Sequence, residues 1–193
     1  MRTALHPIKR TEYIRPMFSH GETLEITGLT ADTLLTWHKR GFLPQLGKRE
    51  QMGRGFRRKY TTFDVVYLVL LKHMVGRVPM AFACVGAARA VDAVITVLEM
   101  ARYADTLQNL NKSPGVSLVA FEDCSGKFRF EVFADRPDAG VPVWPGGGIQ
   151  TWMRTAVVEW ALILDLSTIA LALFARIGDV MERQKARRTA KRA

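Results

Sequence analysis

The clearest pattern in the chain is a pair of short helical repeats near its N-terminus. Apolar positions recur at helical spacing over residues 21–28 and again over residues 31–41, with only a few residues between the two runs. Thr30 precedes the second run and is a good N-cap, while Gly41 supplies a C-terminal stop. Two short helices joined by a tight turn are typical of the helix-turn-helix arrangement.

A stretch rich in glycine and cations follows at residues 44–64 and leads into another helix. Phe56 and Tyr60 are the aromatic residues of this stretch, and we expect them to anchor it to the core while the cations between them face outward. Apolar residues at helical spacing then predict a helix, which either Thr61 or Thr62 can cap.

The second half of the chain combines helices with one β-hairpin. Pro79 opens a helix at its first turn, and a helical pattern continues through residues 91–110. Two segments within residues 116–134 alternate apolar and polar residues around a Cys-Ser-Gly turn, which predicts a β-hairpin. After a loop of prolines and glycines, residues 149–187 predict one long helix, ~58 Å at 1.5 Å per residue.

The charge of the chain favours a polyanionic partner. The 193 residues carry a net charge of +10, and 48% of them are apolar, which is a globular composition. The first 60 residues hold twelve Lys and Arg against five Asp and Glu, whereas residues 61–155 hold nine of each. The excess is concentrated in the N-terminal third, with a smaller patch at the C-terminus, and favours nucleic acid or an anionic membrane.

Cysteine content and hydropathy indicate a cytoplasmic protein. Cys84 and Cys124 are too few for a zinc site or a disulfide framework, and the N-terminus lacks an apolar stretch long enough for a signal peptide. Residues 156–177 are apolar enough to be weighed as a membrane span. Glu159 and Asp165 lie within this run, and each acid near a bilayer centre costs about 2.5–3.5 kcal/mol. We therefore expect a buried helix that needs a partner, not membrane insertion.

Two stretches carry an ordered set of matches to one protein family. The matching residues of the first are Gly21, Leu24, Thr27, Gly28, Thr33, Leu34, Trp37, Gly41, Leu43 and Pro44, and those of the second are Gly55, Phe56, Arg57, Tyr60, Asp64 and Gly76. In this order and spacing, about residues 18–88 resemble the N-terminal DNA-binding domain of the MerR family of bacterial transcription regulators. Leu35 stands where that family usually carries an arginine, and one extra residue separates Arg57 from Tyr60.

The resemblance implies a winged helix-turn-helix domain and a dimer formed through a helix that follows it. The expected fold is mainly α with small β content. A basic arm at residues 1–17 precedes the winged-helix domain at 18–88. Residues 89–187 form a region for dimerisation or effector binding, with the hairpin and the long helix, and residues 188–193 form a basic tail.

Helix-turn-helix geometry and the resemblance together select the candidate DNA contacts. The second helix of such a pair presents its first turns to base edges, while cations hold the phosphates. The groove-facing candidates are Asp32, Thr33, Thr36 and Trp37. The phosphate candidates are Lys39, Arg40, Arg54, Arg57, Arg58 and Lys59, with Tyr60 supporting the wing.

Each candidate also has a structural interpretation that the sequence leaves open. Trp37 can belong to the core, Asp32 can cap its helix, and the cations can form a solvated face. His38 and His73 are expected to be packing residues, because the four histidines show no ligand spacing. The sequence holds no nucleophile–base–orienter set, so we expect no enzymatic activity and no cofactor.

The sequence therefore predicts a cytoplasmic, bacterial or phage-like transcription regulator. It is expected to bind a pseudopalindromic site on double-stranded DNA as a homodimer, with RNA polymerase as a further candidate partner. One alternative is an excision or replication-control factor of a mobile element. Another is a basic membrane-associated protein, which solubility without detergent would argue against.

Overall fold

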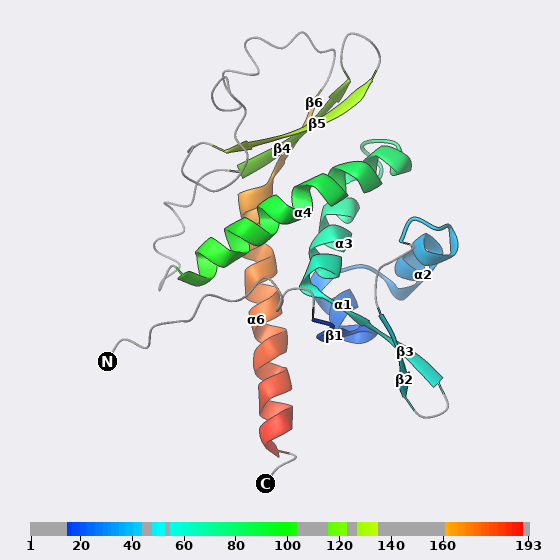
Figure 1. Cartoon of the computed structure of the whole chain (residues 1–193), viewed down its shortest axis with the longest axis vertical. Coiled ribbons are helices and arrows are strands. Elements are labelled where there is room, and N and C mark those ends of the chain that lie inside the picture. Colours follow the sequence, from blue (N-terminus) through cyan, green and yellow to red (C-terminus); the bar gives the residue numbers. More distant parts are fainter. Residues whose placement is uncertain are drawn as a thin grey trace. The chain divides into compact units, whose positions relative to one another are not determined.

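The computed structural model describes residues 15–43, 48–52, 55–103, 116–122, 127–134 and 161–190, which belong to two units (Figure 1). The described residues up to Val69 and those from Ala172 onward form the terminal unit, and those within Leu70–Leu171 form the central unit. The described residues are mainly helical, with two small antiparallel sheets and a C-terminal helix, as the sequence predicts at this level.

The first helix of the terminal unit, α1 (His20–Thr27), is closed at both ends by its own sequence. Ser19 is the N-cap: its Oγ accepts from the backbone N–H of Glu22 at 3.3 Å, and its own N–H donates to the Glu22 carboxylate at 2.8 Å. This reciprocal pair is a capping box. At the other end Gly28 adopts a φ of 62° and donates its N–H to the Leu24 carbonyl at 2.8 Å. The left-handed conformation favours glycine, and it turns the chain toward the next helix.

The second helix, α2 (Ala31–Lys39), begins and ends where the sequence predicts. Thr30 is the N-cap, and its Oγ1 accepts from the backbone N–H of Thr33 at 3.1 Å. Beyond the last turn Gly41 has a φ of 75° and donates to the His38 carbonyl at 3.2 Å. The predicted cap and stop are both confirmed.

A three-stranded antiparallel sheet completes this part of the terminal unit. Its order is β1-β3-β2, from β1 (Phe18–Ser19), β2 (Lys48–Met52) and β3 (Gly55–Tyr60). Phe18 pairs with Tyr60, and both side chains are fully buried. The stretch rich in glycine and cations therefore contains a β2–β3 hairpin, and the pairing of β1 with β3 joins this hairpin to the start of α1.

The helix after the hairpin, α3 (Thr62–Met74), is capped by Thr61, one of the two residues predicted for that role. The Thr61 N–H donates to the Asp64 carboxylate at 2.8 Å, and the Asp64 N–H donates to Thr61 Oγ1 at 3.1 Å. The last helix, α6 (Leu166–Ala190), contributes its part from Ala172 onward to the terminal unit.

In the central unit, α4 (Met80–Tyr103) packs against a second antiparallel sheet of order β5-β4-β6. The strands are β4 (Val116–Glu122), β5 (Phe128–Ala134) and β6 (Ala161–Asp165). The pairing of β4 with β5 confirms the predicted hairpin. Helix α4 begins directly after Pro79 and covers residues 91–103 of the predicted 91–110 helix, while residues 104–110 lie outside the described part of the chain.

The predicted helix at residues 149–187 is wrong over its middle part. Residues 161–165 form β6, which pairs with β4 and places Leu164 opposite Leu118, and the helix begins only at Leu166 and continues to Ala190. Asp165 ends the strand and caps the helix, since its carboxylate accepts from the Thr168 N–H at 3.0 Å. A continuous apolar run fits a buried strand as well as a helix, so periodicity does not separate them. Residues 149–160 lie outside the described residues.

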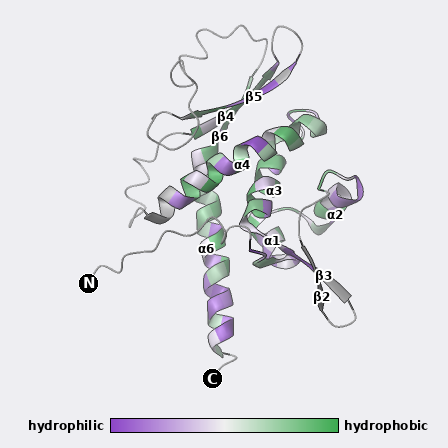
Figure 2. Ribbon diagram, viewed as in Figure 1, coloured by the Kyte–Doolittle hydropathy of each residue, from purple (hydrophilic) through white to green (hydrophobic). Residues whose placement is uncertain are grey.

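Hydropathy within the described residues identifies one segment, Met80–Glu99 of α4, that is long and apolar enough to cross a membrane. Of this window 56% is buried within the protein, and the core helix of a soluble protein passes the same test. Figure 2 shows the apolar residues that run along α3 and α4, and the change of α6 from apolar at its start to hydrophilic near its end. The described part of the apolar run at residues 156–177 is not one helix, because residues 161–165 form β6 and α6 begins at Leu166.

Candidate nucleic-acid interface

Helix α2 has one face in the core and one face in solvent. Leu34 is fully buried and Trp37 is 8% exposed. The exposed side chains of this helix are Ala31, Asp32, Leu35, Thr36 and Lys39, and Arg40 is exposed directly after it. The buried pair fixes which side of α2 faces outward, so the exposed side chains form a defined surface.

Two of the groove-facing candidates have local roles at the start of α2. The backbone N–H of Thr33 donates to the N-cap oxygen, Thr30 Oγ1, and Thr33 Oγ1 lies 2.8 Å from the same oxygen. Asp32 lies in the first turn and is exposed. Thr30 is therefore the cap, and the interpretation of Asp32 as the capping residue is wrong; its carboxylate is instead suited to the positive end of the helix dipole.

Trp37 is a core residue rather than a surface one. With 8% of its surface exposed, its indole lies among buried side chains and is not presented to a ligand on the outer face of α2. Its backbone carbonyl accepts from the Phe42 N–H at 3.0 Å. This burial favours the core interpretation of Trp37 over a groove contact. Thr36, one position earlier, remains on the exposed face.

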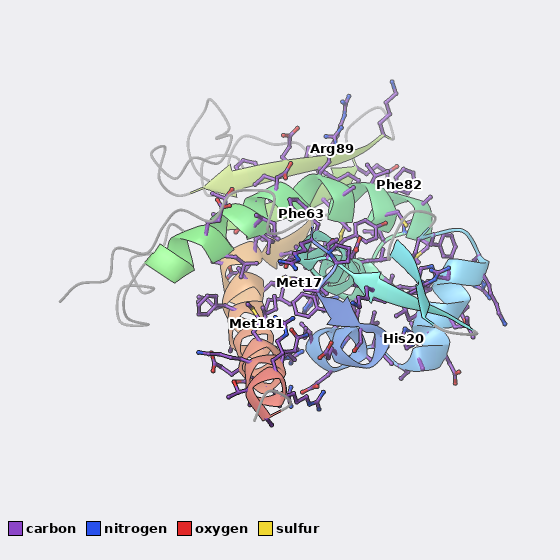
Figure 3. All side chains as sticks on the ribbon, turned by 60° about the horizontal axis from the view of Figure 1, so that its bottom comes forward. Met17, His20, Phe63, Phe82, Arg89 and Met181 are labelled. Atoms are coloured by element: carbon purple, nitrogen blue, oxygen red, sulfur yellow. The ribbon has the colours of Figure 1, made fainter. Side chains whose placement is uncertain are left out.

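A cluster of polar side chains connects the end of α2 to strand β3. Nη1 of Arg58 lies 2.6 Å from Nδ1 and 2.8 Å from Nε2 of His38, and His38 Nε2 lies 3.4 Å from the Tyr60 hydroxyl. The rings of His20 and Tyr60 are also near each other, with centroids 6.3 Å apart (Figure 3 labels His20). The sequence alone does not reveal this cluster, because its members lie 20 and 22 residues apart.

The cluster shifts the ionisation of its members. Burial lowers the pKa of His38, and the positive charge of Arg58 lowers it further, so the imidazole favours its neutral form. For Tyr60 the effect of burial has the opposite direction: it raises the pKa of the hydroxyl, although the positive charge of Arg58 opposes this shift. A neutral His38 leaves the positive charge of Arg58 in place beside the end of α2.

The β2–β3 hairpin brings cationic positions together by its register. Lys48 pairs with Lys59, and Arg49 pairs with Arg58. Arg58 and Lys59 are half-buried, and Tyr60 is fully buried, as expected of a residue that supports the hairpin. Arg57 lies in β3, but its side chain is outside the description, and Arg54 lies outside the described residues altogether.

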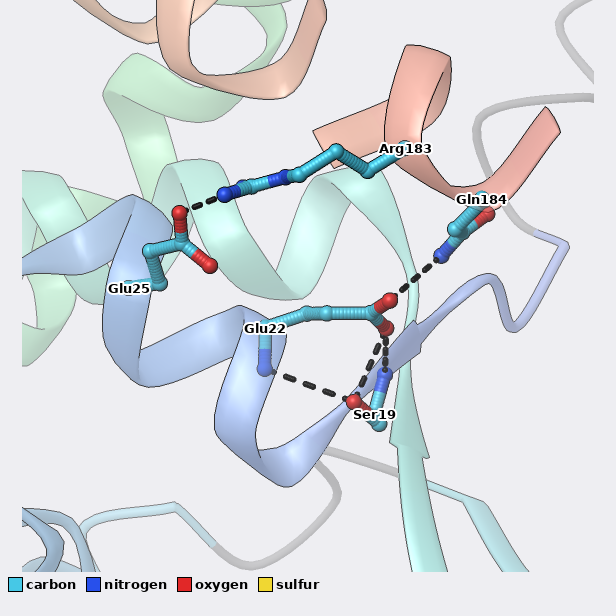
Figure 4. A network of polar contacts seen from close by, with 5 residues as sticks. All are labelled: Ser19, Glu22, Glu25, Arg183 and Gln184. Atoms are coloured by element: carbon cyan, nitrogen blue, oxygen red, sulfur yellow. Dashed lines mark hydrogen bonds and ion pairs between the residues drawn. The ribbon is translucent and has the colours of Figure 1, made fainter. Parts of the chain in front are cut away.

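The C-terminal half of α6 holds α1 through a polar network (Figure 4). Gln184 donates to the Glu22 carboxylate at 3.1 Å and to the Met17 carbonyl at 3.2 Å, and Arg183 pairs with Glu25. Burial alone would raise the pKa of Glu22. Hydrogen bonds from Ser19 and Gln184 and the charge of Arg187 outweigh this effect and lower the pKa. Arg176 adds a hydrogen bond to the Ile26 carbonyl at 3.0 Å.

A scan against protein-family models and a search of curated proteins give no match for this chain. Within the described part of the chain, no group of three or more His, Cys, Asp or Glu side chains could hold a metal ion.

Proposed function

We propose that the protein is a sequence-specific regulator of transcription that binds double-stranded DNA as a homodimer. The observation that supports this most directly is the exposed face of α2, where Thr36 and Asp32 lie beside Lys39 and Arg40. Helix α2 follows α1 after the left-handed turn at Gly28. Two helices in this order, the second with a polar face in solvent, suit insertion into a major groove.

The roles within the proposed interface follow from the chemistry of each group. Thr36 can donate to or accept from a base edge, and the carboxylate of Asp32 can accept from the amino group of cytosine. Lys39 and Arg40 can neutralise phosphates, and Arg58, which lies beside His38, adds a third cation near the end of α2. Trp37 and Tyr60 serve by packing, since both are buried.

The proposal is tested by incubating the purified protein with fragmented genomic DNA near physiological salt and sequencing the bound fragments. Enrichment of a few sites that share an inverted repeat would support a dimeric sequence-specific regulator. Uniform recovery would reduce the protein to a non-specific basic binder. Failure to bind any fragment would overturn the proposal.

Two variants separate base recognition from phosphate binding on the enriched site. Thr36→Ala should relax sequence choice with little change in non-specific affinity, whereas the double change Lys39→Ala and Arg40→Ala should weaken binding to all DNA. Each phosphate contact that is lost should also reduce the slope of log K against log salt by about 0.9.

The matched control for the double variant removes the same charge from exposed positions of the central unit, Arg77→Ala with Lys127→Ala. If this control weakens binding as much as the α2 variant, the effect is one of net charge, and α2 is not the contact.

A further inference from the structure

The largest apolar side chain on the outer face of α2 is Leu35, and 51% of its surface is exposed. It lies at helical spacing from Asp32 and Lys39, so the three side chains share one face with Thr36. Leu34 and Trp37, on the opposite face, are buried and prevent α2 from rotating to cover Leu35. An isolated exposed leucine is common on protein surfaces, but this one lies in the middle of the surface proposed to enter DNA.

From this placement we infer that Leu35 contacts the C5-methyl group of a pyrimidine in the major groove. The inference rests on the proposed function and specifies what α2 recognises. A leucine side chain has no hydrogen-bonding group, and the C5-methyl is the apolar group that a T·A pair presents in that groove. Trp37, a groove-facing candidate from the sequence, is buried, which leaves Leu35 as the large apolar side chain on this surface.

The charges around Leu35 favour DNA over an apolar protein as the occupant of this surface. Lys39 and Arg40 are exposed at the end of the same helix, and Arg58 lies beside His38 in its last turn. Cations in this position suit a phosphate backbone next to the groove. The same methyl group occurs on thymine and on 5-methylcytosine, and the experiment distinguishes these two sources.

The experiment uses the full chain and a site recovered from the genomic capture. Each thymine of one half-site is replaced in turn by uracil, which removes only the methyl group. At one position the change should weaken binding by about fourfold, the value for a buried methyl-sized group. At that position cytosine and 5-methylcytosine, each paired with guanine, are then compared. Tighter binding of the methylated base would identify the methyl group itself as the ligand, whereas equal binding would restrict recognition to thymine.

Variants of Leu35 assign the effect to this side chain. Leu35→Ala should bind the thymine and uracil sites equally, while Leu35→Met, which keeps an apolar side chain of similar size, should retain the preference for thymine. Val85→Ala is the control, because Val85 is also an exposed apolar residue but lies in α4. This variant should keep the wild-type preference for thymine over uracil. Circular dichroism of each variant checks that it is folded.

The outcomes separate this inference from the proposed function. Recovery of specific sites with no uracil effect at any thymine would overturn the inference and leave the proposed function standing. A uracil effect that persists in Leu35→Ala would overturn it as well. If no specific site is recovered, the proposed function fails and this inference fails with it.

Discussion

Gly86 sets how closely α4 approaches strand β5 in the central unit. A Cβ atom at this position would lie 2.4 Å from Met74 Cε and 2.5 Å from Phe130 Cε1, both closer than real contacts allow. Arg89, one turn later in α4, donates to the Phe130 carbonyl at 3.4 Å, which reinforces the same crossing (Figure 3 labels Arg89). The absence of a side chain at Gly86 is thus a packing requirement.

We expect Gly86→Ala to lower the free energy of unfolding by about 1–3 kcal/mol, because the neighbouring side chains must shift to admit the methyl group. Urea denaturation measures the effect. Gly178→Ala is the matched control, because nothing lies within 4 Å of its added Cβ in α6. This control should stabilise the protein by about 0.5–1 kcal/mol through helix propensity. Equal effects of the two changes would contradict the close crossing.

The cluster around His38 predicts a pH dependence of stability. The pKa of His38 is lower in the folded protein than in the unfolded chain. At pH values between these two pKa values, the unfolded chain therefore binds more protons than the folded protein. The contribution of His38 is therefore present above the unfolded pKa, near 6.5, and is lost as the pH falls through the folded pKa. His38→Gln should lose less stability than the wild type as the pH falls below that value.

The measurement is a series of urea denaturations from pH 8 to pH 5 for wild type and His38→Gln. The groups that face His38 are His20 from α1, and Arg58 and Tyr60 from β3, and all of them remain in the variant. Above about pH 7.5 the difference between the proteins should be constant, which is the internal control. Parallel curves over the whole range would show that His38 does not titrate abnormally.

At the scale of elements, the C-terminal half of α6 is held to the terminal unit by a buried side as well as by polar contacts. Val180 is 2% exposed, while the adjacent Met181 is 43% exposed. Val180→Ala should therefore lower the free energy of unfolding by about 1–3 kcal/mol, through the lost apolar contact and the cavity. Met181→Ala should change it by less than about 0.5 kcal/mol. Thermal or urea unfolding compares the two, and equal costs would argue against this packing.

The elements that could be predicted are those with a local signal. The Thr30 cap, the stop at Gly41 and the alternation in the β4–β5 hairpin depend on neighbouring residues, and all three are observed. Strand β1 has only two residues, and β6 is a short apolar segment, so each becomes a strand only through its partner, β3 or β4. Such pairing is tertiary and leaves no periodic pattern in the sequence.

In the candidate site, too, the features set by neighbouring residues in the sequence could be predicted, and those set by tertiary contacts could not. The exposure of Thr36, Lys39 and Arg40 agrees with the helical pattern of α2. The burial of Trp37 and the contact of His38 with Arg58 depend on what the rest of the terminal unit places beside them. A histidine can be recognised in a sequence, but its partner 20 residues away cannot be, since nothing local sets that distance.

At the scale of the whole molecule, the two basic regions of the sequence belong to the same unit. The sequence has two basic regions, one in its first third and one at its C-terminus, and both contribute to the terminal unit. Among its described cations are Lys39, Arg40, Arg58, Lys59, Lys185, Arg187 and Arg188. The proposed DNA surface and most of the excess charge thus belong to the same unit, so electrostatic steering would favour encounters through it.

The oligomeric state is the remaining prediction at this scale. The family resemblance implies a dimer interface on the helix after the DNA-binding domain, at residues 91–110, and the apolar C-terminal helix is a second candidate. Val91, Ile95 and Leu98 of α4 are at most 7% exposed within one chain, as are Leu166 and Leu173 of α6. These side chains already have partners in the same chain. The dimer is therefore proposed from the symmetry of DNA sites, in which two half-sites are bound by two copies.

We expect the free protein to sediment at micromolar concentration with about twice the 21.7 kDa mass of one chain, and two copies to occupy each recovered site. Analytical ultracentrifugation after nuclease treatment measures the first, and titration of a labelled site measures the second. Repeating the sedimentation at high salt is the control, because association through residual nucleic acid would disappear there. If the free protein sediments at 21.7 kDa but two copies occupy each site, the dimer forms only on the DNA. One copy per site would exclude the symmetric dimer, and the inverted repeat would then have no physical cause in this protein.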